Sequence, residues 1–371
     1  MHMKSLIVLF IPFIFHTINS FTLSNFKTIC PDEDTIISSR SKDTILNKQS
    51  ALLHFFLLKY AQLKMIEKWD PIPIPKKSIR NIDTSFIIGL VRRRLFLLED
   101  LKFDNKKNDF DNDLIVGINQ FQKRNGLESK AIIDQTLIRK LNTPIDKIIN
   151  KIKANIIEWN ASPKDSKNEH IVINIPDFKL FVIRNDSCIM DMKVIVGKSK
   201  NKTPLLESEI EYVVLSPYWN IPTSILEKEI APLLKKYPNY LQVHHMEWNG
   251  KMLRQMPGSD NALGGIKFVF ENPYHVYLHD TPVKSLFQKS IRALSHGCIR
   301  IEQPKKLALY LLRNDRNWNE VKIDRGIQSG KEMYIKLLST IPIKTCYFTT
   351  WVNEWGKLEI REDIYNRENV Q

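Results

Sequence analysis

The N-terminal part of the chain repeats apolar residues with the period of amphipathic helices. Between residues 47 and 68, leucine, phenylalanine and tyrosine recur at three- and four-residue spacings and share one helical face. The Pro-rich segment 71–75 stops this helix and is typical of an extended linker. This part of the chain is therefore predicted to be all-α, with further helices at 85–101, 114–124, 132–141 and 145–159.

Near residue 169 the pattern changes to β-branched runs and to alternating apolar and polar residues, which is typical of strands. The fold class is therefore α+β, with an all-α region followed by a β-rich domain over residues 169–371 that contains a helical insertion at about 225–263. Strands are predicted at 170–176, 179–184, 189–196, 211–216, 268–270 and 275–279. Helical spacing returns at 225–236, 285–293, 304–313 and 331–338, and two strands at 347–353 and 357–361 flank a hairpin turn.

The first residues have the pattern of a targeting segment. Lys4 precedes an apolar run from Leu6 to Phe15, and the chain turns polar before Ser20. A run of about ten apolar residues is shorter than the roughly 20 that span a bilayer. The pattern favours an export signal over residues 1–20, with a buried N-terminal strand or helix as the alternative. No later apolar stretch reaches membrane length, so no stable membrane span is expected.

Charge and cysteine usage narrow the possible partners. The chain has 371 residues and a net charge of +14. This surplus could attract an anionic partner. Lysines spread along a generally lysine-rich chain are the favoured explanation. No RNA-binding or zinc-finger pattern occurs, so nucleic acid is not expected as a partner. The four cysteines, which are Cys30, Cys188, Cys298 and Cys346, form no CxxC motif, so a zinc site is not expected, and two disulfides or one catalytic thiol remain open. No cofactor is expected.

The segment 295–300, with its sequence Ser-His-Gly-Cys-Ile-Arg, carries the candidate chemistry. A free thiol is only a few per cent thiolate near neutral pH, so a catalytic Cys298 needs a nearby base. His279 ends a predicted strand, and the spacer that follows is long enough to return to the same sheet edge. His296 lies two residues before Cys298, on the same side of an extended chain.

Two further residues of this segment suit acyl transfer. Gly297 allows a backbone N–H to approach closely, as an oxyanion site requires. Arg300 could hold a substrate carboxylate through paired hydrogen bonds. A buried structural cysteine and a structural histidine are the alternative, and the residues alone leave both interpretations open.

His279 followed by Ser295-His296-Gly297-Cys298-Ile299-Arg300 resembles the signature of the L,D-transpeptidase catalytic domain. The resemblance continues in 219–222, 253–258 and 261–268, is typical of the larger periplasmic enzymes of Gram-negative bacteria, and covers about residues 169–365. It implies a periplasmic, wall-associated and carbapenem-sensitive enzyme, expected to be monomeric, that acts on peptidoglycan stem peptides. Cys298 would form a thioester after D-alanine leaves, and a side-chain amine of another stem would resolve it into a 3→3 cross-link.

The same resemblance implies roles for the surrounding residues. His279 would be the base, and the backbone N–H groups of Gly297, Cys298 and Tyr277 would bind the oxyanion. Asp280 follows the base where many members have glycine or serine. Trp219 and Tyr277 line the cleft or pack the core, and the insertion resembles a mobile lid whose Met246, Trp248 and Met252 touch substrate or pack the lid.

Residues 114–127 and 132–142 are similar to a peptidoglycan-binding helical module. The Phe121–Leu127 part of its motif is intact, whereas the usual turn at 129–134 is degraded. A same-site hydrolase and a non-catalytic wall-binding protein remain the alternatives. The expected division is a signal peptide at 1–20, a helical scaffold at 21–83, the module at 84–143, a helical linker at 144–168 and the catalytic domain at 169–371.

Overall fold

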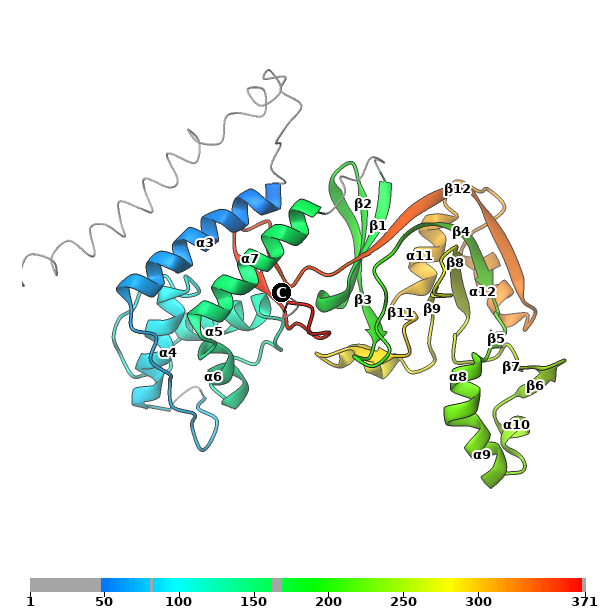
Figure 1. The fold of residues 1–371 in the computed structure, drawn as a ribbon, viewed down its shortest axis with the longest axis horizontal. Coiled ribbons are helices and arrows are strands. Elements are labelled where there is room, and N and C mark those ends of the chain that lie inside the picture. Colours follow the sequence, from blue (N-terminus) through cyan, green and yellow to red (C-terminus); the bar gives the residue numbers. More distant parts are fainter. Residues whose placement is uncertain (1–47, 81–82, 162–168, 369–371) are drawn as a thin grey trace, which may run out of the picture. The chain divides into compact units, whose positions relative to one another are not determined.

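The computed structural model of the protein describes residues 48–80, 83–161 and 169–368 (Figure 1). The expected signal peptide over residues 1–20 and Cys30 lie outside these ranges. Within them, no helix combines the length and the apolar character that crossing a membrane requires.

The N-terminal described residues form the predicted helices. Side chains cap three of them, because Ser85, Asp111 and Asp134 each accept a hydrogen bond from a backbone N–H of the first turn. The prediction of an all-α region is confirmed. The helices are α3 (Lys48–Ile66), α4 (Phe86–Leu97), α5 (Asn112–Arg124), α6 (Gln135–Leu141) and α7 (Ile145–Ala161).

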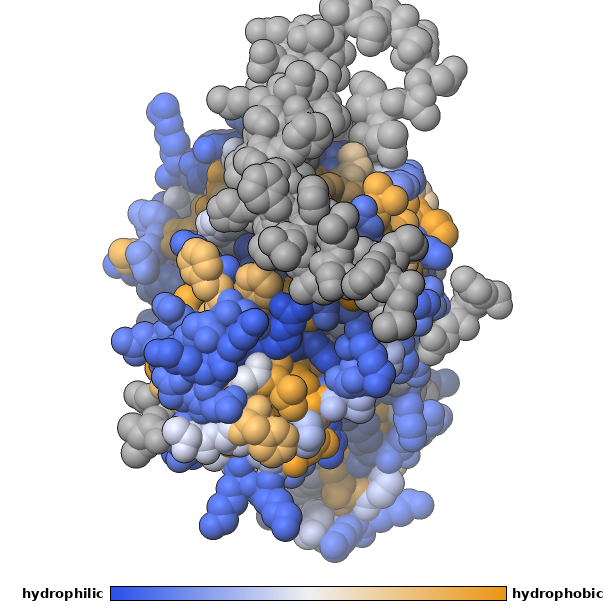
Figure 2. All heavy atoms as spheres, turned by 90° about the vertical axis from the view of Figure 1, so that its left-hand side faces the viewer, coloured by the Kyte–Doolittle hydropathy of each residue, from blue (hydrophilic) through white to orange (hydrophobic). Residues whose placement is uncertain are grey.

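These helices share one apolar core with the C-terminal hairpin of β13 (Thr350–Val352) and β14 (Leu358–Ile360). At its edge, Arg124 Nε donates to Asp100 Oδ1 over 2.6 Å, and Arg124 Nη1 donates to the Leu358 carbonyl. Figure 2 looks onto the helical side, where hydrophilic residues predominate and apolar patches are separate.

A sheet that closes on itself forms the second part of the fold. Its strand order is β10-β3-β11-β9-β8-β4-β12-β1-β2, and β2 also pairs with β3. The strands are β1 (Glu169–Asn174), β2 (Lys179–Arg184), β3 (Ser187–Gly197), β4 (Glu207–Leu215), β8 (Ile266–Phe270), β9 (Leu278–His279), β10 (Ala293–Ser295), β11 (Ile299–Ile301) and β12 (Met333–Cys346).

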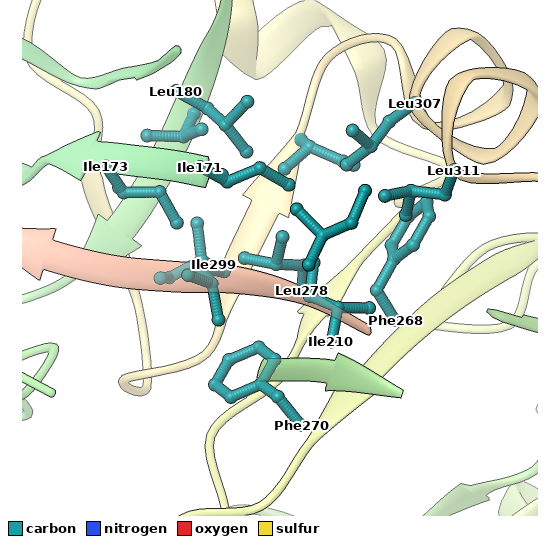
Figure 3. Packing of buried hydrophobic residues seen from close by; sticks show 14 of the residues in the cluster. Ile171, Ile173, Leu180, Ile210, Phe268, Phe270, Leu278, Ile299, Leu307 and Leu311 are labelled. Carbon is teal, nitrogen blue, oxygen red and sulfur yellow. The ribbon is translucent and has the colours of Figure 1, made fainter. Parts of the chain in front are cut away.

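The interior of this sheet is filled by branched and aromatic side chains. Figure 3 shows Ile171, Ile210, Leu278 and Leu307 meeting in this core. Leu307 belongs to α11 (Pro304–Leu311), and α12 (Glu320–Gln328) adds further apolar contacts. Strand alternation leaves the opposite faces of the same strands for polar residues, which is where the candidate site lies.

Three local predictions need correction. The helix predicted at 331–338 is wrong, because these residues lie in β12, where buried Ile335 and Leu337 alternate with exposed Tyr334 and Lys336. Pairing with β4 satisfies their backbone and overrides the helical spacing. The strand predicted at 275–279 is limited to β9, and the helix predicted at 285–293 is a short 3₁₀ turn, η3 (Lys284–Gln288), followed by β10.

The segment between β4 and β8 begins with one short strand, continues through helical turns and ends in two strands. It runs through α8 (Thr223–Ile225), the π-helical turn η2 (Leu226–Ile230), α9 (Ala231–Lys236) and α10 (Tyr240–Val243). A three-stranded sheet of β5 (Trp219–Asn220), β6 (Met246–Asn249) and β7 (Met252–Gln255) completes it. Ile221, Ile230 and Leu253 form its own small core.

Candidate active site

Parallel pairing of β9 with β11 brings the two halves of the motif together. Ile299 lies opposite Leu278 and Arg300 lies opposite His279, and the Ile299 N–H donates to the Tyr277 carbonyl over 3.2 Å. The segment that contains Cys298 therefore returns beside the strand that carries His279, although a long stretch of chain separates them.

Hydrogen bonds fix the loop that presents the thiol. Ser295 Oγ donates to the Cys298 carbonyl over 2.6 Å and accepts the Gly297 N–H over 3.1 Å. Thr203 Oγ1 donates to the Gly297 carbonyl over 2.8 Å. Gly297 has φ +119°, which side-chain-bearing residues rarely adopt. Because its N–H is bonded to Ser295, Gly297 shapes the loop in this structure.

Tyr277 is the immediate partner of the half-buried Cys298 thiol. Both its backbone N–H and its hydroxyl hydrogen-bond to Cys298. Burial raises the pKa of the Cys298 thiol above its usual value, and the charges of Lys267 and Arg300 oppose this shift. Burial and the adjacent Cys298 also raise the pKa of Tyr277, so its hydroxyl keeps its proton and can donate to the sulfur.

His279 is held as a neutral imidazole. Its side chain is buried, and its Nδ1 lies 2.6 Å from the Asp280 carbonyl oxygen, with the Leu263 carbonyl as a second partner of the ring. Burial, followed by the charge of Arg300, lowers the pKa of His279 to about 3. The bond to Asp280 assigns the proton to Nδ1 and leaves Nε2 as the basic nitrogen.

The carboxylate of Asp280 has a different task from its carbonyl. It accepts the Gly265 N–H over 3.0 Å and the Thr281 N–H over 2.7 Å, and it pairs with Lys284. Gly264 has φ +63°, and a Cβ there would lie 2.5 Å from the Asp280 carboxylate. The backbone of Asp280 therefore orients the imidazole, while its side chain anchors the neighbouring loop.

His296 points to the insertion. Its Nε2 lies 2.7 Å from Glu229 Oε1 in η2, and both side chains are partly exposed. The spacing in sequence suggested a position near the sulfur, whereas the structure gives this imidazole a carboxylate partner on another element. Trp219 packs against the core of the insertion, Met246 is half-buried beside that core, and Trp248 and Met252 are exposed.

Replacing Glu229 with glutamine should lower kcat/KM for acylation of Cys298 about 2- to 5-fold. This is the range that corresponds to the loss of one partly exposed ion pair. The melting temperature should change little, because the pair lies at the surface. Glu227→Gln is the matched control, since Glu227 is exposed on the same turn. Equal rates for the two variants would contradict a role for the contact with His296.

Sequence reasoning missed Lys267, Glu229 and Thr203. The alternation in β8, where Ile266 and Phe268 are buried, could have placed Lys267 on the polar face, whereas Glu229 and Thr203 gave no local signal. Cys188 is an exposed free thiol, and the buried Cys346 places its Sγ 3.6 Å from the Ile173 carbonyl. In the described ranges, no three His, Cys, Asp or Glu side chains are grouped to bind a metal.

Residues 168–323 match the model of the YkuD family, the L,D-transpeptidase catalytic domain. Over these residues the chain is similar to that catalytic domain. The match contains both the His279 strand and the Cys298 loop, so the resemblance seen in the motif is confirmed.

The chain is also similar to several known proteins. A Haemophilus influenzae protein named "Putative L,D-transpeptidase" is 33% identical over 216 residues, which cover 53% of this chain and 44% of that protein. The chain therefore spans less than half of this curated relative. An L,D-transpeptidase structure from Mycobacterium smegmatis aligns over 48% of this chain and 58% of that one, with 16% identity and a TM-score of 0.27. An L,D-transpeptidase structure from Stackebrandtia nassauensis aligns over 63% of this chain and 91% of that chain, with 14% identity and a TM-score of 0.27.

Proposed function

We propose that the protein is an L,D-transpeptidase that forms 3→3 cross-links between peptidoglycan stem peptides through a Cys298 thioester. The observation that carries the proposal is the buried, neutral His279, which the Asp280 carbonyl orients on the strand next to the Cys298 loop, inside the YkuD match. A neutral imidazole can accept the thiol proton, which the raised pKa of Cys298 keeps on the sulfur before attack.

In the first half-reaction, Cys298 Sγ attacks the carbonyl carbon between the third and fourth stem residues. The thiol proton passes to His279 Nε2. The C–N bond then breaks, the leaving D-alanine amine takes that proton, and the stem remains as a thioester on the sulfur. The tetrahedral oxyanion needs preorganised donors. The proposed donors are the Cys298 N–H and Tyr277, which hydrogen-bonds to Cys298.

In the second half-reaction, the side-chain amine of another stem attacks the thioester carbon. His279 Nε2 takes a proton from this amine, the C–S bond breaks, and the proton returns to the sulfur. A new amide forms between two third residues. Arg300, opposite His279, is the proposed partner of a substrate carboxylate.

The other parts of the chain fit this activity. The insertion at about 225–263 would cap the site as a lid, and the Glu229–His296 contact supports this placement. Residues 84–143 would be the peptidoglycan-binding-like module and residues 169–371 the catalytic domain. We propose a location in the periplasm at the cell wall, where this substrate lies, and a monomeric state.

Incubating the purified protein with disaccharide-tetrapeptides tests the proposal by mass analysis of the products. The expected result is dimers joined between third residues, each formed with loss of one D-alanine, and a carbapenem adduct on the Cys298 peptide. If tripeptides form without dimers, the activity is that of a hydrolase, in which water attacks the thioester in the second step. If neither dimers nor tripeptides form and no carbapenem adduct appears, the site is not an acyl-transfer centre.

A further inference from the structure

Three residues form a row across neighbouring strands on the polar side of the sheet. Lys267 of β8 lies opposite His279 of β9, and His279 lies opposite Arg300 of β11. Residues directly opposite one another project from the same face, and neighbouring strands lie about 4.8 Å apart. A lysine and an arginine therefore flank the catalytic imidazole within reach of a single small anion.

Both cations act on the proposed reacting groups. Lys267 Nζ lies 4.1 Å from the ring centre of Tyr277, whose hydroxyl bonds to Cys298. The charges of Lys267 and Arg300 act on Cys298 and on His279 alike. Glu332 is the carboxylate that acts on Lys267, and its Oε1 also accepts the Tyr218 N–H over 2.9 Å.

Arg300 has unused hydrogen-bonding capacity. Its Nε is buried and has no hydrogen-bond partner in the part of the chain that the structure describes. Burial lowers the pKa of the Arg300 guanidinium, against the opposing effect of Cys298. A buried cationic donor without a partner is costly, and an anionic ligand that accepts from it removes this cost.

We propose that Lys267 and Arg300 form a carboxylate clamp beside Cys298 that holds the free carboxylate of the residue released from the donor stem. This inference rests on the proposed function. The leaving residue carries its carboxylate on the carbon next to the scissile nitrogen, so the carboxylate lies close to His279 when the carbonyl carbon reaches Sγ. The clamp thus places the leaving amine beside the imidazole that must protonate it.

The clamp also explains how the site selects its donor. Arg300 and Lys267 both lower the pKa of His279, so they oppose formation of the imidazolium. A bound carboxylate counters part of this positive charge and makes the imidazole a stronger base. A donor that lacks a carboxylate at the leaving residue loses the ion pairs and also this activation.

Alkylation of Cys298 by iodoacetate and by iodoacetamide tests the clamp without requiring any transpeptidase activity. Both reagents report the same thiolate, so their rate ratio isolates attraction of the carboxylate. Lys267→Met should lower the iodoacetate-to-iodoacetamide ratio about 3- to 10-fold at low salt, and Lys267→Arg should restore it. Lys336→Met is the matched control, because Lys336 is an exposed lysine on β12. A ratio in Lys267→Met equal to that of the control would overturn the proposal.

Donor peptides identify which carboxylate is held. One stem carries lysine at its third position and isoglutamine at its second, so that the terminal carboxylate is its sole carboxylate, and a second stem has a terminal carboxamide instead. Lys267→Met should slow acylation by the first donor at least 10-fold and change acylation by the second less than 3-fold. Equal losses on both donors would overturn the clamp.

A third donor combines a diaminopimelate residue at the third position with a terminal carboxamide. Acylation of the wild type by this third donor should stay slow. If its rate instead equals that of the donor with a terminal carboxylate, the clamp binds the carboxylate of the third residue, and the assignment to the leaving residue is overturned. If the wild type is acylated by no donor, the proposed function fails, while the alkylation ratio still decides whether Lys267 attracts a carboxylate to Cys298.

Discussion

Cys298→Ala should abolish product formation and the carbapenem adduct, while the variant keeps its fold. Alanine removes the sole sulfur held by Tyr277, and no other cysteine of the described ranges lies at this site. The loop keeps its shape, because Ser295 Oγ bonds to the backbone of residue 298 and not to its thiol. The measurements are mass analysis of the muropeptide products and circular dichroism of the same sample.

Cys188→Ser is the matched control for this substitution. Cys188 is an exposed thiol on β3, so its replacement should leave product formation within about twofold of the wild type. Cross-linked dimers from a folded Cys298→Ala protein would refute the nucleophile assignment. Loss of product in Cys188→Ser at an unchanged melting temperature would show that a second thiol takes part.

His279→Gln should lower the acylation rate by about 10²–10⁴-fold, the usual cost of losing a general base. The glutamine can still hydrogen-bond to the Asp280 carbonyl but cannot accept the thiol proton at neutral pH. His296→Gln is the matched comparison, because this imidazole faces Glu229, and its loss should cost far less. Equal losses in the two variants would contradict the assignment of His279 as the base.

The pH dependence of the wild type gives a separate view of the same residue. Because burial lowers the pKa of His279 to about 3, the imidazole stays neutral across pH 5–7, and acylation should show no acid limb near pH 6.5. The same lowered pKa contributes stability that is fully present above the ordinary histidine pKa of about 6.5 and is lost as the pH falls towards 3. An acid limb near pH 6.5 would show that the imidazole is not desolvated in solution.

The sequence alone predicts that His279 lowers the pKa of the Cys298 thiol, and the charges around the thiol lead to a different expectation. A base that lowers the thiol pKa predicts that His279→Ala raises it towards the free value of about 8.5. In the structure, burial already holds the pKa of Cys298 above its usual value, and the nearby charges belong to Lys267 and Arg300. We therefore expect the alkylation pH profile of Cys298 to respond more to Lys267→Met, which removes a charge that favours the thiolate, than to His279→Gln.

The sequence by itself determined the elements and the motif whose signals are local. Apolar spacing on a helical period identified α3, α4, α5 and α7, because each helix satisfies its own backbone and needs only one apolar face. The Ser-His-Gly-Cys segment and the preceding His279 marked the site, because the type of chemistry depends on which residues are present. The resemblance carried by this motif agrees with the YkuD match over residues 168–323.

The tertiary structure decided what depends on strand pairing and on side-chain direction. Pairing with β4 made residues 333–346 a strand, and the register of β8, β9 and β11 aligned Lys267, His279 and Arg300. Folding brings His296 next to Glu229, which lies far from it in sequence, and the two side chains hydrogen-bond. The His279 imidazole hydrogen-bonds to the backbone carbonyl of Asp280 and not to the Asp280 carboxylate, and the Gly297 N–H donates to Ser295 Oγ. Sequence spacing does not encode these outcomes, because register and side-chain direction are fixed only when distant strands pair and bury one face.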